Sequence, residues 1–377
     1  MLKKCSLKNP LYYYIFVQLG KLYKVHMLNT DNVGVIDLFC GIGGLSRGFY
    51  EEKFKILAGV DADSSCKYAF ETNNDSIFID EKIEDVSSEV IKKLFKGTKT
   101  KILVGCAPCQ PFSSYMFKDF EKKDNKWTLL YEFSKLIKET SPDIISMENV
   151  PQLMNFKKAP VLKDFIKSLE DLNYYVSYKI VYCPNYGIPQ NRKRFVLLAS
   201  KYGPINLIEP THGAKDYMTV KDAIGNLQPL SDGEESANDK MHRARKLSPI
   251  NKERMLNTPY GGGWKSWPEH LKLTCHKKSG GKTYMSVYGR MKWEEPSPTI
   301  TTHCTGYGNG RFGHPEQHRA ITLREAALLQ TFPLEYKFYP ENQSFSSSRV
   351  ARQIGNAVPV ELGRVIAKSI RLHINQY

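Results

Sequence analysis

The sequence predicts an α/β fold with an open, mostly parallel sheet and a second, smaller and irregular domain. From Val33 onward, short apolar runs of strand length alternate with turns and helical stretches, which is typical of such a sheet. After about Tyr202, proline, glycine and lysine become more frequent and the periodicity fades until Leu323. A chain of 377 residues can bury the large core that this plan requires.

Six apolar runs are predicted to form strands, and several of them end at residues that can bind a ligand or react. The runs are Val33 to Phe39, Lys55 to Val60, Lys101 to Val104, Asp143 to Met147, Tyr174 to Val181 and Arg194 to Ala199. The first four are followed in turn by the glycine-rich turn Cys40 to Gly44, by Asp61, by Gly105 and by Glu148. Ligands of open α/β sheets bind beyond the carboxyl ends of the strands, so we expect a site there.

The chain is predicted to divide into four segments, residues 1–32, 33–204, 205–319 and 320–377. The second carries the strands and the third is the irregular domain. The last begins with a short predicted helix, Leu323 to Gln330, and ends with a longer one, Pro359 to His373, which returns to the sheet. Residues 1–26 look unlike anything downstream, and we expect a chain that begins at Met27 to be sufficient.

Positive charge is concentrated in the irregular domain. The chain has 54 Lys and Arg against 39 Asp and Glu, a net charge of +15, which indicates a polyanionic partner or a generally basic proteome. Between Lys240 and Lys292, 13 Lys and Arg stand against two acidic residues, a surplus of 11 in 53 residues. The same stretch carries five Tyr and Trp side chains and the run Gly261 to Gly263. Clustered cations neutralise phosphates, so we expect a nucleic-acid surface here.

Cysteine usage favours a cytoplasmic protein. Eight cysteines lie at irregular spacings and no secretion signal precedes them, which favours free thiols in a reducing compartment. The apolar run Leu11 to Leu19 is interrupted by tyrosines and is too short to span a membrane.

A glycine-rich turn follows the first strand, in VIDLFCGIGGLSRGF, Val35 to Phe49. Glycines at 41, 43 and 44 let backbone amides and a helix N-terminus approach a nucleotide-like ligand, although a tight structural turn would use the same residues. Asp61, one strand later, can accept hydrogen bonds from ribose hydroxyls. The alternative for Asp61 is a helix N-cap.

Cys106 and Cys109 form a CxxC motif within GCAPCQPFS, Gly105 to Ser113, and it has three possible functions. A zinc site is disfavoured, and we expect no metal centre, because no second CxxC or matching His pair is present. A redox pair would resemble the thioredoxin site, but the preceding tryptophan is missing and the chain is long and basic. The third possibility is a nucleophilic Cys109 held between Pro108 and Pro111.

Two further motifs place charged side chains near the edge of the sheet. MENV, from residue 147 to residue 150, puts Glu148 at a strand end, either as a ligand-binding carboxylate or as a helix cap. QNRKRF, from residue 190 to residue 195, puts Arg192 and Arg194 on one face of a strand start. They can contact phosphate or base oxygens there, or lie on a solvated edge.

In their order, these motifs resemble those of the DNA cytosine-5 methyltransferase family, from about Val33 to the C-terminus. DLFCGIGGLSRGF looks like the cofactor loop of that family and APCQPFS like its nucleophile loop, and MENV and QNRKRF follow in the family order. REAALLQTFP, Arg324 to Pro333, and QIGNAVPVELG, Gln353 to Gly363, complete six ordered blocks. The resemblance implies a Rossmann-like S-adenosylmethionine-dependent methyltransferase domain at 33–204 and a small irregular target-recognition domain at 205–319, with 320–377 returning to the catalytic domain.

The resemblance also implies a covalent mechanism on double-stranded DNA. Cys109 would attack carbon 6 of a flipped-out cytosine, so that carbon 5 can take a methyl group from S-adenosylmethionine. Glu148 would hold the N3 edge of the base, Arg194 would hold its oxygen, and Arg192 would support the geometry of the loop and of the phosphate. Base flipping costs a few kcal/mol, which phosphate contacts and the pocket must offset.

The residues that match cofactor-binding positions of the family are Phe39, Gly41, Ile42, Gly43, Asp61, Pro108 and Asn356. The sequence departs from the family beside the adenine. An acidic residue in a pattern like Asp-Ile-x-Asp-Val often meets the adenine amine, but residues 82–86 here read KIEDV, so Asp80 or Asp85 is the expected substitute. Ala62 stands where several relatives place a large side chain against adenine, and Val360 where a second proline is usual.

The resemblance therefore implies a bacterial or phage-type modification enzyme, acting as a monomer, with a partner restriction endonuclease. A tRNA cytosine-5 methyltransferase is the alternative within the class, but its Cys-Phe-Thr signature is absent. A non-catalytic DNA-binding protein is the alternative from another class. It is disfavoured because Cys109, Glu148 and Arg194 are all intact.

Overall fold

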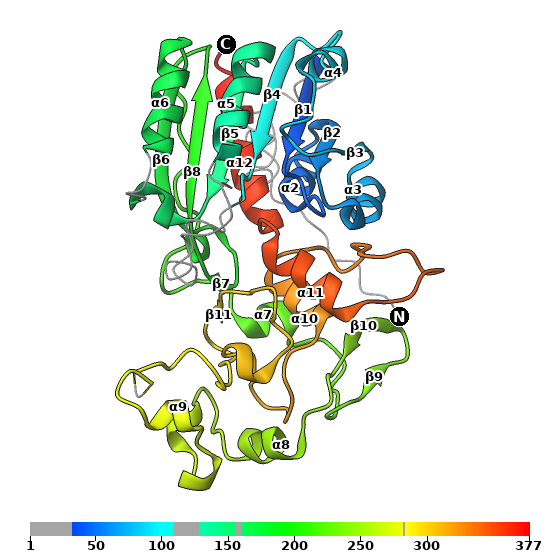
Figure 1. Ribbon diagram of the computed structural model, residues 1–377, viewed down its shortest axis with the longest axis vertical. Coiled ribbons are helices and arrows are strands. Elements are labelled where there is room, and N and C mark those ends of the chain that lie inside the picture. The colour runs from blue at the N-terminus through cyan, green and yellow to red at the C-terminus, as the bar shows by residue number, and fades with distance from the viewer. Residues whose placement is uncertain (1–31, 109–127, 156–159, 282) are drawn as a thin grey trace, which may run out of the picture.

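The computed structural model describes residues 32–108, 128–155, 160–281 and 283–377. A seven-stranded sheet with the order β3-β2-β1-β4-β5-β8-β6 forms the upper half of the molecule (Figure 1). Its strands are β1 (Val33–Leu38), β2 (Lys55–Asp61), β3 (Ile77–Asp80), β4 (Thr100–Gly105), β5 (Ile144–Asn149), β6 (Tyr175–Tyr182) and β8 (Lys193–Ser200). Neighbours from β3 to β5 are parallel, whereas β8 is antiparallel to both β5 and β6. The predicted α/β fold with a mostly parallel sheet is confirmed.

Helices cover both faces of this sheet. One face carries α2 (Gly44–Glu51), α3 (Lys67–Asn74) and α12 (Val360–Ile374), and the other carries α4 (Ser88–Leu94), α5 (Leu129–Thr140) and α6 (Val161–Asp171). In β1, Val35 joins the first core and Ile36 the second, because successive side chains of a strand point to opposite faces. Burial on both faces explains why the strands are continuous apolar runs. In the described ranges, no helix is long and apolar enough to cross a membrane.

The chain between β8 and α10 (Leu323–Leu329) forms most of the lower half of Figure 1 and consists of short elements joined by turns. They are α7 (Val220–Ile224), β9 (Glu235–Ser236), β10 (Asp239–Arg243), α8 (Pro249–Leu256), α9 (Thr274–Lys277) and β11 (Ser297–Pro298). β11 pairs in parallel with β7 (Gln190–Asn191), which anchors this region beside the start of β8. A separate small core surrounds Trp264 and Trp267. These elements are too short to produce a repeating apolar pattern in the sequence.

The chain returns to the sheet through α10, α11 (Ser347–Asn356) and α12. α12 packs against α2 where Gly48 and Gly363 meet, and a Cβ atom on Gly48 would lie 2.6 Å from the Cα atom of Gly363. Glycine at this crossing allows the two backbones to approach closely. α10 and α12 match the predicted helices, whereas α11 lies outside them.

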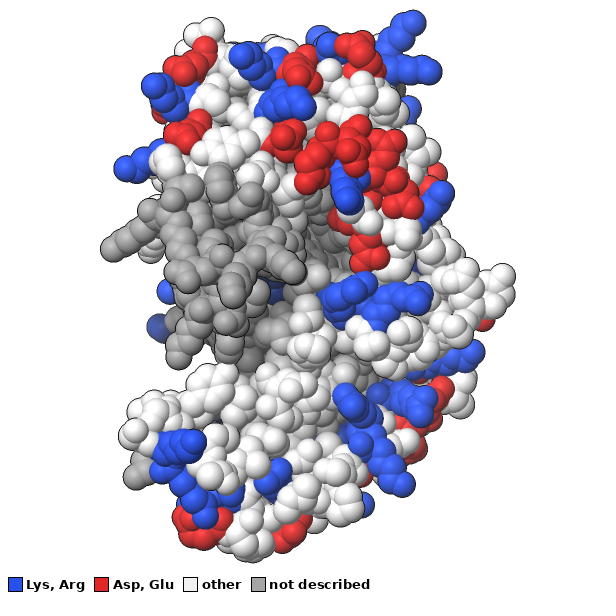
Figure 2. Space-filling view, viewed as in Figure 1, with Lys and Arg blue, Asp and Glu red and all other residues white. Residues whose placement is uncertain are grey.

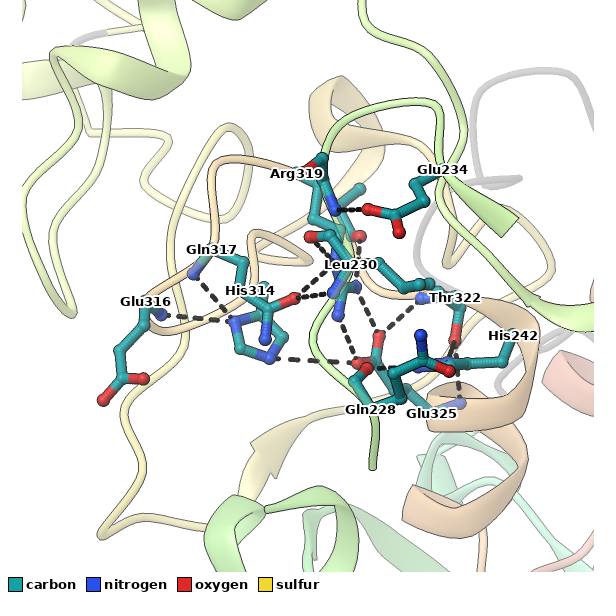
Figure 3. A network of polar contacts seen from close by, with 12 residues as sticks. Gln228, Leu230, Glu234, His242, His314, Glu316, Gln317, Arg319, Thr322 and Glu325 are labelled. Carbon is teal, nitrogen blue, oxygen red and sulfur yellow. Dashed lines mark hydrogen bonds and ion pairs between the residues drawn. The ribbon is translucent and has the colours of Figure 1, made fainter. Parts of the chain in front are cut away.

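A buried polar network joins the lower half of the molecule to α10 (Figure 3). Thr322 and Glu325 form a reciprocal capping box at the start of that helix. His242 contacts the Thr322 hydroxyl through one ring nitrogen, at 3.1 Å, and the Gln228 carbonyl through the other, at 2.7 Å. The carboxylate of Glu325 also pairs with Arg319. The network fixes the last residues of the irregular region against the returning helices.

Candidate active site

A cavity of about 760 Å³ opens at the carboxyl ends of β1, β2, β4 and β5. Its walls include these predicted residues: Phe39, Gly41, Ile42, Asp61, Pro108, Glu148, Arg192, Arg194 and Asn356. Gly43 is not a wall residue, although its neighbours Ile42 and Gly44 are. Cys109 lies outside the described residues. Acidic side chains gather on the upper half of the face in Figure 2, with mainly Lys and Arg below them.

The glycine turn after β1 is shaped by close contacts with other segments of the chain. Gly43 has φ +84°, and a Cβ atom there would lie 2.3 Å from Nδ2 of Asn74. A Cβ atom on Gly44 would lie 2.3 Å from the carbonyl oxygen of Val358, so the returning chain packs directly on the turn. Phe39 adopts φ +60°, which is rare for a bulky residue and typical of functional turns. The turn is therefore built both for tight packing and for access to the cavity.

Asp61 ties this turn to the end of β2. One carboxylate oxygen accepts the Gly41 N–H at 2.8 Å and the other accepts the Asp63 N–H at 2.9 Å. Burial raises the pKa of Asp61, which these backbone hydrogen bonds partly counteract. The helix-cap alternative applies to Asp63 instead, because Asp63 is the N-cap of the short helix η2 (Ser64–Cys66). Asp61 is thus a wall carboxylate held in a fixed orientation.

Asp37 is a wall residue that the sequence prediction missed. It is 1% exposed, and Oδ2 accepts the Ser46 hydroxyl at 2.6 Å. Oδ1 has no hydrogen-bond partner among the described residues. Burial raises the pKa of Asp37 to about 7. The signal in the sequence was an acid inside the apolar run VIDLF, where a buried carboxylate needs a reason.

Glu148 occupies the end of β5 and is 2% exposed. Nε of Arg194, from β8, lies 2.8 Å from Oε1 in an ion pair. The Cys106 thiol donates a hydrogen bond to Oε2 at 2.7 Å. The helix-cap alternative is therefore wrong for Glu148, because its carboxylate meets charged and thiol groups instead of helix N–H groups.

Arg192 is 4% exposed and braces three segments of the chain. One terminal nitrogen donates to the Gln190 side chain and to the Ile300 carbonyl, both at 3.3 Å, and the other donates to the Ala357 carbonyl at 3.4 Å. Burial lowers the pKa of Arg192 to about 10. A solvated strand edge is thus wrong for Arg192, which lies at the join between β7, the irregular region and the returning chain.

The rim of the cavity after β3 has an unexpected composition. Glu81, Lys82, Ile83 and Glu84 line it, together with Ala62 from the end of β2. The two acids that we expected to substitute for the family residue, Asp80 and Asp85, are not wall residues. The acids nearest to the cavity in this segment are therefore the two glutamates.

Helix α11 closes the cavity from the far end of the chain. Arg352 forms an ion pair with Asp63, with Nη2 and Oδ2 separated by 2.9 Å. The Gln353 side chain donates to the Ser65 carbonyl at 3.0 Å. Asn356 ends this helix and lines the cavity. α11 was not among the predicted helices, and the chain after it packs on the glycine turn at Val358.

Comparison with known proteins identifies a family along most of the chain. The family model described as C-5 cytosine-specific DNA methylase matches residues 33–372. The type II methylase M.HgiDII of Herpetosiphon aurantiacus is 56% identical over 337 residues, which are 89% of this chain and 94% of that protein. The type II methyltransferase M.PspPI of Psychrobacter sp. is 34% identical over an alignment that covers 92% of this chain and 80% of that protein.

Solved structures support the same fold. A putative DNA modification methyltransferase encoded within an E. coli prophage superposes with a TM-score of 0.70 at 23% identity, covering 91% of this chain and 99% of its own. Spodoptera frugiperda DNMT2 superposes with a TM-score of 0.58 at 19% identity, covering 90% of this chain and 99% of its own. At these identities the likeness establishes the architecture.

Proposed function

The chain belongs to the family of C-5 cytosine-specific DNA methylases, and from this premise we propose how its cavity methylates cytosine. The protein is a site-specific DNA cytosine-5 methyltransferase of the type II restriction–modification class. The tRNA alternative is not favoured, because the similar curated proteins are type II DNA enzymes. We assign the reaction to Cys109, Glu148 and Arg194, with Arg192 supporting them.

The cavity suits S-adenosylmethionine, which supplies an electrophilic methyl group when it is bound. Three features support this assignment. The volume of about 760 Å³ accommodates a nucleoside with an amino-acid arm. The unpaired Oδ1 of Asp37 is an acceptor suited to an ammonium group. Asp61 holds a fixed carboxylate after β2, where ribose hydroxyls are usually bound.

Cys109 is proposed as the nucleophile, on the resemblance of its motif, since it lies outside the described residues. Its thiolate bonds to carbon 6 of cytosine, and the electron pair of the 5,6 double bond moves toward carbon 5. Carbon 5 would then take the methyl group, as its bond to the sulfonium of bound S-adenosylmethionine breaks and leaves a neutral thioether. A base removes the proton from carbon 5, and the thiolate leaves carbon 6 as the double bond forms again.

Glu148 and Arg194 are proposed to hold the flipped cytosine during attack. Glu148 offers its carboxyl group to N3, where proton sharing makes carbon 6 more electrophilic. Arg194 lies against the same carboxylate and offers its remaining N–H groups to the base oxygen. The ion pair between these residues at the wall of the cavity is the single observation that carries the proposed mechanism.

The concentration of positive charge in one part of the chain supports separate roles for its domains. We propose that residues 33–204 and 320–377 carry out the chemistry and that 205–319 read the DNA sequence, with the basic stretch 240–292 contacting phosphates. A cognate restriction endonuclease is the expected partner in the same system, as the names of the type II relatives suggest.

The proposed function is tested by methylating genomic DNA with the purified protein and S-adenosylmethionine, then mapping 5-methylcytosine at single-base resolution. We expect one short recurrent sequence to be modified at one cytosine. Glu148→Gln should lose most of the activity while binding the cofactor normally. Modification at adenine, or the absence of a recurrent sequence, would overturn the proposal.

A further inference from the structure

The proposed function uses one cysteine of the CxxC motif and leaves Cys106 without a role. β4 and β5 are parallel, and their register pairs Gly105 with Met147. Continued by one residue, this register places Cys106 opposite Glu148. The Cys106 N–H donates to the Leu38 carbonyl at 3.3 Å, so the residue extends the pairing of β4 with β1. Cys106 is therefore held in place by the backbone of the sheet.

A second cross-tie joins the same two strand ends. The Asn149 side chain donates to the Ala107 carbonyl at 3.1 Å, one residue beyond the pair of Cys106 with Glu148. The Cys106 Sγ atom lies 2.7 Å from Oε2 of Glu148, and the opposite oxygen meets Arg194. Since Glu148 is 2% exposed, water does not compete freely for either oxygen. Oε1 has no hydrogen-bond partner among the described residues, so the ion pair with Arg194 holds this oxygen by charge, and the thiol of Cys106 supplies the hydrogen bond at Oε2.

We propose that Cys106 is a positioning residue that orients Glu148 toward the base through its thiol hydrogen bond. The inference rests on the proposed function of Glu148. It gives the CxxC motif two thiols with separate roles, Cys109 in the reaction and Cys106 on the carboxylate.

The choice of a thiol has a chemical consequence. An S–H group is a weak hydrogen-bond donor, whereas a hydroxyl group is a strong one. A strong donor stabilises an ionised carboxylate and makes it a poorer partner for a proton. The thiol therefore fixes the orientation of Glu148 with little loss of its readiness to share a proton with N3.

Other charged and titratable groups lie around Glu148. Arg194 from β8 and Arg192 just before that strand are both positive. Arg194 forms the ion pair with Glu148, and Arg192 interacts electrostatically with the same carboxylate. Cys183, from the short helix η6 (Cys183–Tyr186), lies on the same side and is buried. Burial raises the pKa of Cys183 to about 11, so it adds no negative charge at neutral pH.

The contact itself is tested without turnover, by the S–H stretching band in Raman spectra of the free protein. Cys106→Ala should remove one band at lowered frequency, which identifies it as the hydrogen-bonded thiol. Glu148→Gln should move that band to higher frequency, because an amide oxygen accepts less strongly than a carboxylate. Cys183→Ala, the matched loss of a neighbouring buried thiol, should leave the band in place. If the frequency of the band does not change in Glu148→Gln, the contact is overturned.

The positioning role is tested by the pH profile of kcat/KM for the parent, Cys106→Ser and Cys106→Ala. Glu148→Gln identifies the limb that this carboxylate controls, because that limb should disappear. The limb should move to lower pH in Cys106→Ser and to higher pH in Cys106→Ala, and kcat should fall about tenfold in Cys106→Ala and by less in Cys106→Ser. Serine keeps a donor at the same place but a stronger one, so it should restore part of the kcat that alanine loses.

The outcomes separate the two proposals. Superimposable profiles for all three proteins, or equal losses of kcat in the serine and alanine variants with normal thermal unfolding, overturn the positioning role. If Glu148→Gln moves the Raman band but methylates at the parent rate, the proposed function of Glu148 fails and the contact remains as a structural feature without a catalytic role.

Discussion

Arg319 and Glu325 form a bidentate ion pair inside the joint between the irregular region and α10 (Figure 3). Nη1 donates to Oε2 at 2.8 Å and Nη2 to Oε1 at 2.7 Å, and both side chains are 1% exposed. Nε of Arg319 also donates to the Leu230 carbonyl at 3.3 Å, and Glu325 accepts the Thr322 N–H at 2.7 Å. The pair therefore connects Leu230, inside the irregular region, and Arg319, at its end, to the first turn of the returning helix.

Glu325→Gln should destabilise the protein strongly. The amide keeps the shape of the side chain but leaves the Arg319 guanidinium buried without a counter-charge, which typically costs about 3–5 kcal/mol. Urea unfolding followed by circular dichroism measures the change. Glu89→Gln, which breaks the exposed pair with Lys92 on α4, is the matched control and should cost at most about 0.5 kcal/mol. Similar losses in both variants would contradict a special role for the buried pair.

Asp37 should couple cofactor binding to the release of a proton. Because burial raises its pKa to about 7, the free protein is about half protonated there at neutral pH. An ammonium group at the unpaired Oδ1 would favour the carboxylate, so binding should release a proton near pH 6 to 7 and affinity should fall as the pH is lowered through that range. Calorimetry in two buffers with different ionisation enthalpies measures the proton count.

Asp37→Asn should bind S-adenosylmethionine more weakly and without this pH dependence, whereas Asp80→Asn, at the exposed end of β3, should behave like the parent. The raised pKa of Asp37 also makes the stability of the folded protein depend on pH. A carboxyl whose folded-state pKa is raised contributes stability that is present below the unfolded value of 3.8 and is lost as the pH rises through about 7. Proton release that persists in Asp37→Asn would assign the titration to another group.

The strand ends were predictable because of the period of the sequence. Buried parallel strands are short apolar runs, and the residue after each run must lie at the carboxyl edge of the sheet. This pattern is sufficient to bring Asp61 and Glu148 to one cavity. It does not distinguish a wall carboxylate from a helix cap, which depends on where the next N–H groups point. The structure decides this for Asp61 and Asp63, two residues apart.

Other features depend on contacts between distant segments, which a single sequence does not encode as a pattern. The Cys106–Glu148 contact depends on the register of β4 against β5. Asp37 was hidden because one acid in an apolar run leaves the period intact. Helix α11 has a clear apolar face, but the glycine at 355 and the polar residues around it weaken the helical signal. Gly355 is needed there because a Cβ atom would lie 2.3 Å from the Thr301 carbonyl carbon.

Binding to DNA should weaken steeply with salt. If the stretch 240–292 contacts phosphates, each neutralised phosphate releases counterions, and affinity should fall by orders of magnitude over a few-fold rise in salt. Lys265→Gln, an exposed side chain in this stretch, should weaken binding to all sequences and lower the slope of log K against log salt by about one. Lys92→Gln on α4 is the matched loss of an exposed charge and should leave the slope unchanged. Fluorescence anisotropy with labelled duplexes measures both.

The covalent mechanism is tested with DNA that carries 5-fluorocytosine at the target. After methyl transfer, the enzyme must remove the other substituent at carbon 5 before Cys109 can leave carbon 6. A proton is removed by a base, but fluorine cannot leave as a cation, so the protein should remain bonded to the DNA. Gel electrophoresis under denaturing conditions detects the adduct, which should form only with S-adenosylmethionine.

Cys109→Ser should abolish the adduct, because a hydroxyl group is a far poorer nucleophile at neutral pH. Cys106→Ser should still form it, since a thiol redox pair needs both cysteines and methyl transfer needs one. An adduct that survives Cys109→Ser, or that requires Cys106, would place the nucleophile elsewhere.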